Sequence, residues 1–164
     1  MTSFRIFEII LYSCLNLLPY LGLALYPFAD KLRFSKVKVG LFIFLLLFFQ
    51  TSLGIYATTC SQGQKGMLSL ISTLCYGIFY FFVVKETPGK LIFVLLIVSN
   101  FANFIVICAK WMESQIFPKM VFDNNSWSFS LCTFVAQIIF IPMLFIYFRK
   151  YIKEIATIET GRKV

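Results

Sequence analysis

The chain has 164 residues, of which 60% are hydrophobic and 13% are charged, and its formal net charge is +8. A soluble globular domain carries about a quarter charged residues, so this composition excludes an ordinary soluble fold and indicates a lipid-facing surface. Histidine is absent, which excludes a phosphoacceptor histidine, a histidine metal ligand and a Cys–His catalytic pair within this chain. For this length we expect one compact helical domain, without a metal, a cofactor or a nucleic-acid partner.

Five long apolar runs follow one another along the chain and are separated by short polar segments. A helix needs about 20 residues to cross the hydrocarbon core of a bilayer, where only a helix satisfies its own backbone hydrogen bonds within a single run. The runs that come close to this length are residues 6–27, 39–59, 67–84, 91–109 and 128–148. The sequence therefore predicts an all-α membrane protein, a bundle of about five transmembrane helices in the plasma membrane.

The segments around these runs predict how the chain is organised. The first run contains Glu8 and Asn16 and lacks a small-residue cleavage site, so we do not expect it to be a cleaved signal peptide. Pro88 and Gly89 predict a tight turn after the third run. We expect residues 1–148 to form the transmembrane domain, and residues 149–164 to form a basic cytoplasmic tail or linker helix, because apolar residues recur there at helical spacing.

The basic residues alternate between the two sides of the predicted membrane. Of the 15 Lys and Arg residues, 11 lie in segments 28–38, 85–90 and 149–164, and 4 lie on the other side. Positive charge accumulates on the cytoplasmic side of membrane proteins. The sequence therefore predicts an N-terminus outside the cell and a C-terminus inside it.

Four of the predicted helices carry one amide side chain close to the bilayer midplane. These residues are Asn16, Gln50, Asn100 and Gln137, and we expect all four to point into the bundle, because an unpaired amide in hydrocarbon is unfavourable. Two interpretations stay open. The amides could join neighbouring helices by hydrogen bonds, or they could line a polar cavity that binds a ligand.

Several short motifs resemble one family of membrane proteins. They include Leu-Pro-Tyr at 18–20, Ser-Asn-Phe-Ala-Asn at 99–103 and Trp-Ser-Phe-Ser-Leu-Cys at 127–132. Together with the apolar runs, which make the resemblance cover most of the chain, they resemble the N-terminal membrane region of bacterial sensor histidine kinases with a GHKL-type ATPase domain, common in Firmicutes. This chain departs from that family's pattern because the phosphoacceptor helix and the ATP-binding domain are missing.

The resemblance implies the input region of a two-component signalling receptor, without kinase activity of its own. The expected partners are membrane lipid, an extracellular peptide or lipophilic ligand, and a second copy of the chain in a homodimer. Signal transfer would be a shift of packed helices, which a ligand can cause only by binding two arrangements with different affinity. The alternatives are a small transporter-like membrane protein or a structural partner subunit of another membrane protein.

We expect the ligand site in the outer half of the fourth apolar run and in the connection beyond it. Amide groups one helical turn apart, a pair of opposite charges and two aromatic rings would combine polar contacts with an apolar wall there. The residues of this predicted site are Asn100, Asn103, Lys110, Trp111, Glu113 and Trp127. The competing interpretation is that the amides hold helices together and that the tryptophans anchor the chain at the membrane interface.

Overall fold

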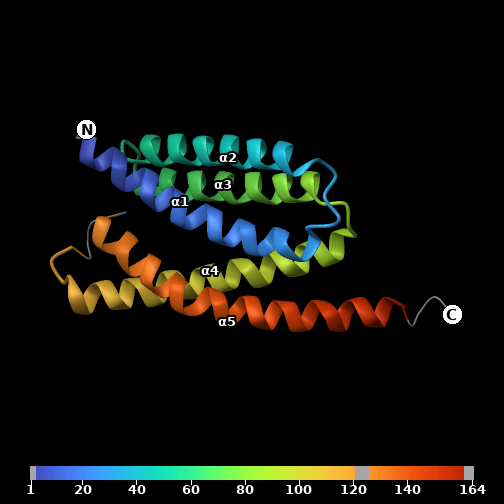
Figure 1. The fold of residues 1–164 in the computed structure, drawn as a ribbon. Coiled ribbons are helices and arrows are strands. Elements are labelled where there is room, and N and C mark those ends of the chain that lie inside the picture. The colour runs from blue at the N-terminus through green and yellow to red at the C-terminus, as the bar shows by residue number, and fades with distance from the viewer. Residues whose placement is uncertain (1–2, 121–125, 161–164) are drawn as a thin grey trace.

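The computed structural model describes residues 3–120 and 126–160, and this part of the chain is helical apart from short connections (Figure 1). The elements in chain order are α1 (Ser3–Leu25), η1 (Tyr26–Phe28), α2 (Lys36–Ala57), α3 (Gln62–Val83), α4 (Pro88–Ile116) and α5 (Trp127–Thr160). All five α-helices are long and apolar enough to cross a membrane. The prediction of an all-α, five-span membrane protein is therefore confirmed at the level of helix number and type.

The helix boundaries correct one detail of the sequence prediction. Pro88 and Gly89 are not turn residues but the first two residues of α4, because proline lacks the N–H that a first helical position leaves unpaired. Residues 149–160, expected as a tail or linker helix, are the continuation of α5, which runs as one helix to Thr160. At 1.5 Å per residue its length is about 50 Å, which exceeds a hydrocarbon core of about 30 Å.

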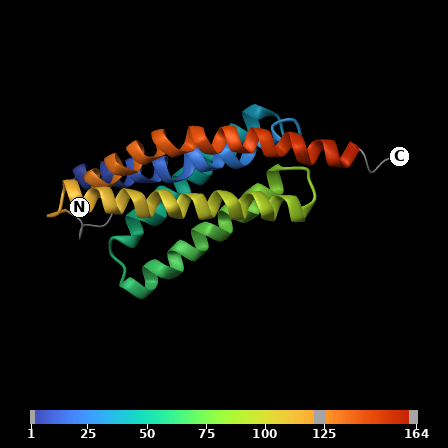
Figure 2. The same cartoon turned by 90° about the horizontal axis from the view of Figure 1, so that it is seen from below.

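Helix α1 lies at the centre of the bundle, in contact with α2, α4 and α5. Helices α4 and α5 pack against each other along much of their length, as Figures 1 and 2 show. The remaining helices form a hairpin, α2–α3, which contacts α1 through α2. In Figure 2 this hairpin diverges from α4 towards the α2–α3 turn. The fold is therefore a core of α1, α4 and α5 with a more loosely attached hairpin.

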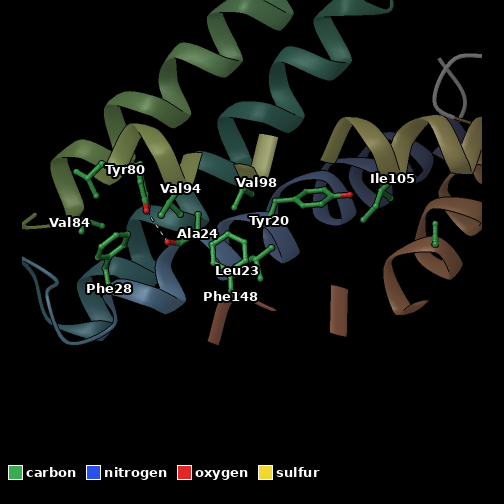
Figure 3. Close-up of a cluster of buried hydrophobic side chains, with 12 residues drawn as sticks. Tyr20, Leu23, Ala24, Phe28, Tyr80, Val84, Val94, Val98, Ile105 and Phe148 are labelled. Atoms are coloured by element: carbon green, nitrogen blue, oxygen red, sulfur yellow. Dashed lines mark hydrogen bonds between the residues drawn. The ribbon is translucent and has the colours of Figure 1, made fainter. Parts of the chain in front are cut away.

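Burial differs sharply between α2 and the other helices. A large apolar cluster, drawn in Figure 3, joins α1, η1, α3, α4 and α5. Its buried members are Tyr20, Leu23, Ala24, Phe28, Tyr80, Val84, Leu91, Val94, Val98, Ile105, Ala136 and Phe148. Helix α2, in contrast, buries only Val39. Most of the surface of α2 is thus available to lipid.

The loops that join α1 to α2 and α3 to α4 are fastened to each other. The amide of Lys85 donates to the carbonyl of Lys31 at 2.8 Å, and the amide of Arg33 donates to the carbonyl of Val83 at 2.9 Å. The Lys31 ammonium lies 2.5 Å from the Glu86 carboxylate, which also faces Lys90 at 3.6 Å. The hairpin is therefore fixed at this end, whereas its turn lies at the opposite end of the bundle (Figure 1).

Candidate functional site

A cavity of about 720 Å³ lies between α1, α2 and α3, where α1 and α3 stand apart on either side of α2. Its walls are unusually polar for a space between membrane-spanning helices. Hydroxyl and amide groups from all three helices line it, namely Ser13, Asn16, Gln50, Thr58, Ser69, Ser72, Thr73 and Tyr76. The volume is within the range of about 300–1,000 Å³ that is typical of small-molecule sites.

Helix α3 supplies one polar wall of this cavity through its sequence spacing. Ser69, Ser72, Thr73 and Tyr76 follow the i, i+3, i+4, i+7 pattern, which places them on one face of a helix. The Tyr76 hydroxyl donates a hydrogen bond to Oε1 of Gln50 on α2. This bond connects the two helices of the hairpin across the base of the cavity.

A smaller cavity of about 190 Å³ continues from the larger one and shares Asn16, Thr73 and Tyr76 with it. Its walls come from α1, α3 and α4 and are mainly apolar, with Leu17, Leu21, Leu95 and Val98 among them. Tyr80 lines it as well and donates its hydroxyl to the carbonyl of Ala24 at 2.9 Å. The two cavities therefore form one path that leads from polar walls towards the apolar cluster.

Three of the four midplane amides face the interior as expected. Gln137 is buried and donates to the carbonyl of Leu15 at 2.8 Å, whereas Asn16 and Gln50 line the larger cavity. Asn100 is exposed, so the prediction that it points inward is wrong. The buried face of α4 includes Val98. Asn100 is two residues further along, and each residue of an α-helix turns by about 100°, so its side chain points about 200° away from Val98.

A second polar cluster lies at the end of the bundle where α4 ends and α5 begins. Glu113 is completely buried, and its carboxylate accepts hydrogen bonds from Ser126 Oγ at 2.7 Å, Ser128 Oγ at 2.5 Å and Lys110 Nζ at 2.7 Å. Ser126 Oγ also accepts a hydrogen bond from the amide of Phe129 at 3.3 Å. The cluster therefore caps α5 and fastens it to α4.

Glu8 extends this fastening to α1. It is buried, its Oε1 accepts a hydrogen bond from the amide of Trp127 at 2.9 Å, and its Oε2 faces Arg5 at 2.8 Å. An unpaired buried charge is very unfavourable, whereas a carboxylate with a cation and an amide donor is tolerated. Two carboxylates thus hold the start of α5 between α1 and α4.

The structure does not gather the six predicted site residues into one pocket. Asn103 lines the smaller cavity, and none of the other five lines either cavity. Lys110 and Glu113 form the ion pair that their spacing of three residues predicted. Glu113 is completely buried, however, and does not lie at a solvated helix end. Trp111 is 67% exposed, and Trp127 packs edge-on against Phe117 at 5.3 Å. Their role in ligand binding stays a prediction.

The features that sequence reasoning missed are the partners of the buried carboxylates and the cavity beside the polar face of α3. The serine and threonine spacing along α3 was the available signal, because it repeats at helical intervals towards Lys65. No sequence signal connects Glu8 with Trp127, which lie 119 residues apart.

The geometry defines a class before any comparison is made: a multi-pass helical membrane protein with an open polar cavity between its first three helices. No known family model matches this chain, and neither a curated protein nor a solved structure matches it. The function is therefore argued from the cavity, the helix packing and the sequence motifs.

Proposed function

We propose that this chain is a membrane-embedded receptor, the ligand-binding input region of a GHKL-type sensor histidine kinase. The observation that carries the proposal is the polar cavity of about 720 Å³ between α1, α2 and α3. Polar groups inside a membrane span are costly and are commonly functional. The motifs at 99–103 and 127–132 supply the more specific resemblance to sensor kinases.

The packing of the hairpin offers a means of response. One end of α2–α3 is fixed by the bonds from Lys31 and Arg33, while the opposite end diverges from α4 (Figure 2). A ligand in the cavity would contact α1, α2 and α3 together. It would shift the population of hairpin positions if it bound one position more tightly than another.

Helix α5 is the proposed output element. Its start is held by Glu8 and Glu113, and its backbone continues as one helix to Thr160. A displacement of α1 relative to α4 would therefore move the start of α5. In this proposal the chain has no catalytic activity of its own, and a kinase domain coupled to α5 produces the signal.

A cavity-filling substitution tests the proposal. In a fusion of the full chain to a GHKL kinase domain, Ser72→Trp should fill the larger cavity and change the autophosphorylation rate severalfold, with little change in melting temperature. The control is Leu74→Trp, because Leu74 lies on the same helix but is 65% exposed. An equal effect of both substitutions on kinase output, or no effect of Ser72→Trp, would contradict the receptor function.

A further inference from the structure

We infer that the ligand of this cavity is a small hydrophilic anion, with its negative group near Arg5 and Lys65 and an apolar end in the smaller cavity. This inference rests on the proposed receptor function and adds the chemical class of the ligand. It follows from three properties of the cavity walls: their charge, their hydrogen-bonding groups and their change from polar to apolar with depth.

The charge of the walls favours an anion. Arg5 and Lys65 both line the larger cavity, and within residues 3–120 and 126–160 no Asp or Glu lines either cavity. Part of the Arg5 charge is compensated by Glu8 at 2.8 Å, so Lys65 supplies much of the attraction. A charge acts more strongly between helices in a bilayer than in water, because the surrounding medium screens it less.

The hydrogen-bonding groups of the walls favour a hydrophilic body over a lipid chain. Lys65 and Tyr76 are 11 residues apart on α3, which corresponds to about 16 Å of helix. Along this length Ser69, Ser72 and Thr73 line the cavity. An acyl chain beside them would leave the amide of Asn16, which lines both cavities, without water or a polar ligand group, which is unfavourable.

The smaller cavity accounts for the apolar end of the ligand. It begins at Asn16 and Tyr76 and is then lined by Leu21, Leu95 and Val98. Its volume of about 190 Å³ suits one apolar substituent of side-chain size. A ligand that enters from the Lys65 end would thus place its charge near Lys65, its polar body beside the serines of α3 and its apolar group in the smaller cavity.

Thiol reagents of opposite charge test this inference without knowledge of the ligand. In full-length protein whose five cysteines are replaced, Ser72→Cys is reconstituted in phosphatidylcholine nanodiscs. It is then treated with 2-sulfonatoethyl methanethiosulfonate or with the trimethylammonium analogue. Each reaction rate at the cysteine is divided by the rate of the same reagent with free 2-mercaptoethanol. We expect this normalised rate to be about tenfold higher for the anionic reagent than for the cationic one, because fixed cations concentrate anions in a narrow cleft. The control Leu74→Cys should react with neither reagent, since Leu74 is exposed towards lipid.

The charge variants complete the test. Lys65→Gln should reduce the preference for the anionic reagent severalfold. Lys119→Gln, which changes the net charge equally but at an exposed position that does not line the cavity, should leave it unchanged. Equal reduction by both variants, or a normalised preference for the cationic reagent, would overturn the anionic ligand while leaving a hydrated receptor cavity intact.

Two further outcomes separate the remaining possibilities. If Ser72→Cys reacted with neither reagent, the cavity would not be hydrated, and the receptor function itself would fail together with this inference. If nanodiscs of phosphatidylglycerol slowed the anionic reagent at Ser72→Cys tenfold or more relative to phosphatidylcholine, a lipid headgroup would be the occupant. That result would overturn the soluble anion.

Discussion

Glu113 shows how much a single side chain contributes to the end of this bundle. Its carboxylate accepts hydrogen bonds from Lys110 on its own helix and from Ser126 and Ser128 at the start of α5. The Lys110 ammonium also lies 4.4 Å from the centre of the Phe129 ring. Removal of the carboxylate would take away the acceptor that Ser126 and Ser128 share, leaving their hydroxyl groups 2.9 Å from each other, and it would remove the negative charge that faces Lys110.

We therefore predict that Glu113→Ala lowers the free energy of unfolding by about 3–5 kcal/mol, as expected for loss of one partner from a buried charged pair. Thermal unfolding of purified protein in detergent, followed by circular dichroism at 222 nm, measures the effect. Ser114→Ala is the matched control, because Ser114 is adjacent and only partly buried, and its hydroxyl bonds no charged group, only the carbonyl of Trp111 and the side-chain amide of Gln115. A Glu113→Ala melting temperature equal to that of the control would refute the capping role.

Glu86 gives the loop end of the hairpin a dependence on pH. Its pKa is lowered from the ordinary value of 4.5, chiefly because the Lys31 ammonium donates a hydrogen bond to it, with the Thr87 backbone and Lys90 acting in the same direction. A carboxyl group whose pKa is lowered by folding stabilises the folded state above its unfolded pKa. That stabilisation disappears as the pH falls through the lower, folded value.

We expect the melting temperature to decrease as the pH falls from about 5 to about 3, and we expect this decrease to be larger in the unsubstituted protein than in Glu86→Gln. The difference should be small, because partly exposed ion pairs are worth about 0.2–1 kcal/mol. A pH series of calorimetric melting curves, with Asp30→Gln as a control for an exposed acid nearby, measures it. Parallel curves for the protein and for Glu86→Gln would disprove this contribution.

The contrast between Asn100 and Glu113 shows what residue-level sequence reasoning can reach. The ion pair of Lys110 with Glu113 was predictable from their spacing of three residues. The burial of Glu113 was not, because it depends on serines that lie 13 and 15 residues further along the chain. The exposure of Asn100 was likewise hidden, since all faces of α4 are apolar and the sequence does not show which face meets α1 and α5.

At the scale of helices, α1 and α2 are in close contact at Gly54. A Cβ atom added there would lie 2.9 Å from Cγ2 of Ile9, whereas one added at Gly40 would meet nothing within 4 Å. Glycine therefore permits the contact that attaches the hairpin to α1. It also shapes the larger cavity, which both Gly54 and Ile9 line.

We predict that Gly54→Leu displaces α2 from α1 and lowers the free energy of unfolding by about 1–3 kcal/mol, the usual cost of overpacking. Gly40→Leu on the same helix is the matched control and should not destabilise the protein. Denaturation by increasing amounts of sodium dodecyl sulfate, followed by circular dichroism, compares the two. Recovery of stability in Gly54→Leu combined with Ile9→Ala would locate the clash, and equal stability of the two leucine variants would argue against it.

The helices themselves were predictable because their length and apolarity are fixed by the bilayer. The ends were less predictable, because α4 and α5 continue past their apolar runs to Ile116 and Thr160. Amphipathic ends such as Lys110–Ile116 gain stability from packing that the sequence does not reveal. The polar face of α3 was visible in the spacing of its serines and threonines, but the cavity beside it depends on the separation of α1 from α3.

At the scale of the whole molecule, the alternation of the five helices places the N-terminal end of α1, the α2–α3 turn and the α4–α5 connection at one end (Figure 1). That end carries Arg5, Lys65, Lys110 and Lys119. Among the residues that the structure describes, the opposite end carries the basic residues of segments 31–38, 85–90 and 149–153.

We predict that the end with four basic residues lies outside the cell, because the other 11 basic residues lie in sequence segments 28–38, 85–90 and 149–164, which favours the cytoplasm for those segments. In intact cells, a membrane-impermeant maleimide should label Gln64→Cys on a cysteine-free background. It should label Gly89→Cys only after the cells are permeabilised. The reverse pattern would show that the protein has the opposite orientation.

The bond between Glu8 and the amide of Trp127 has a consequence for synthesis of the chain. The two residues are separated by 119 positions. At a synthesis rate of about 5–20 residues per second, Trp127 is therefore made roughly 6–24 s after Glu8. Arg5, only three residues away, is present from the beginning and faces the carboxylate at 2.8 Å. The nascent first helix thus carries its own counter-ion, which pairs with the acid before α5 is made and stays paired with it in the complete fold.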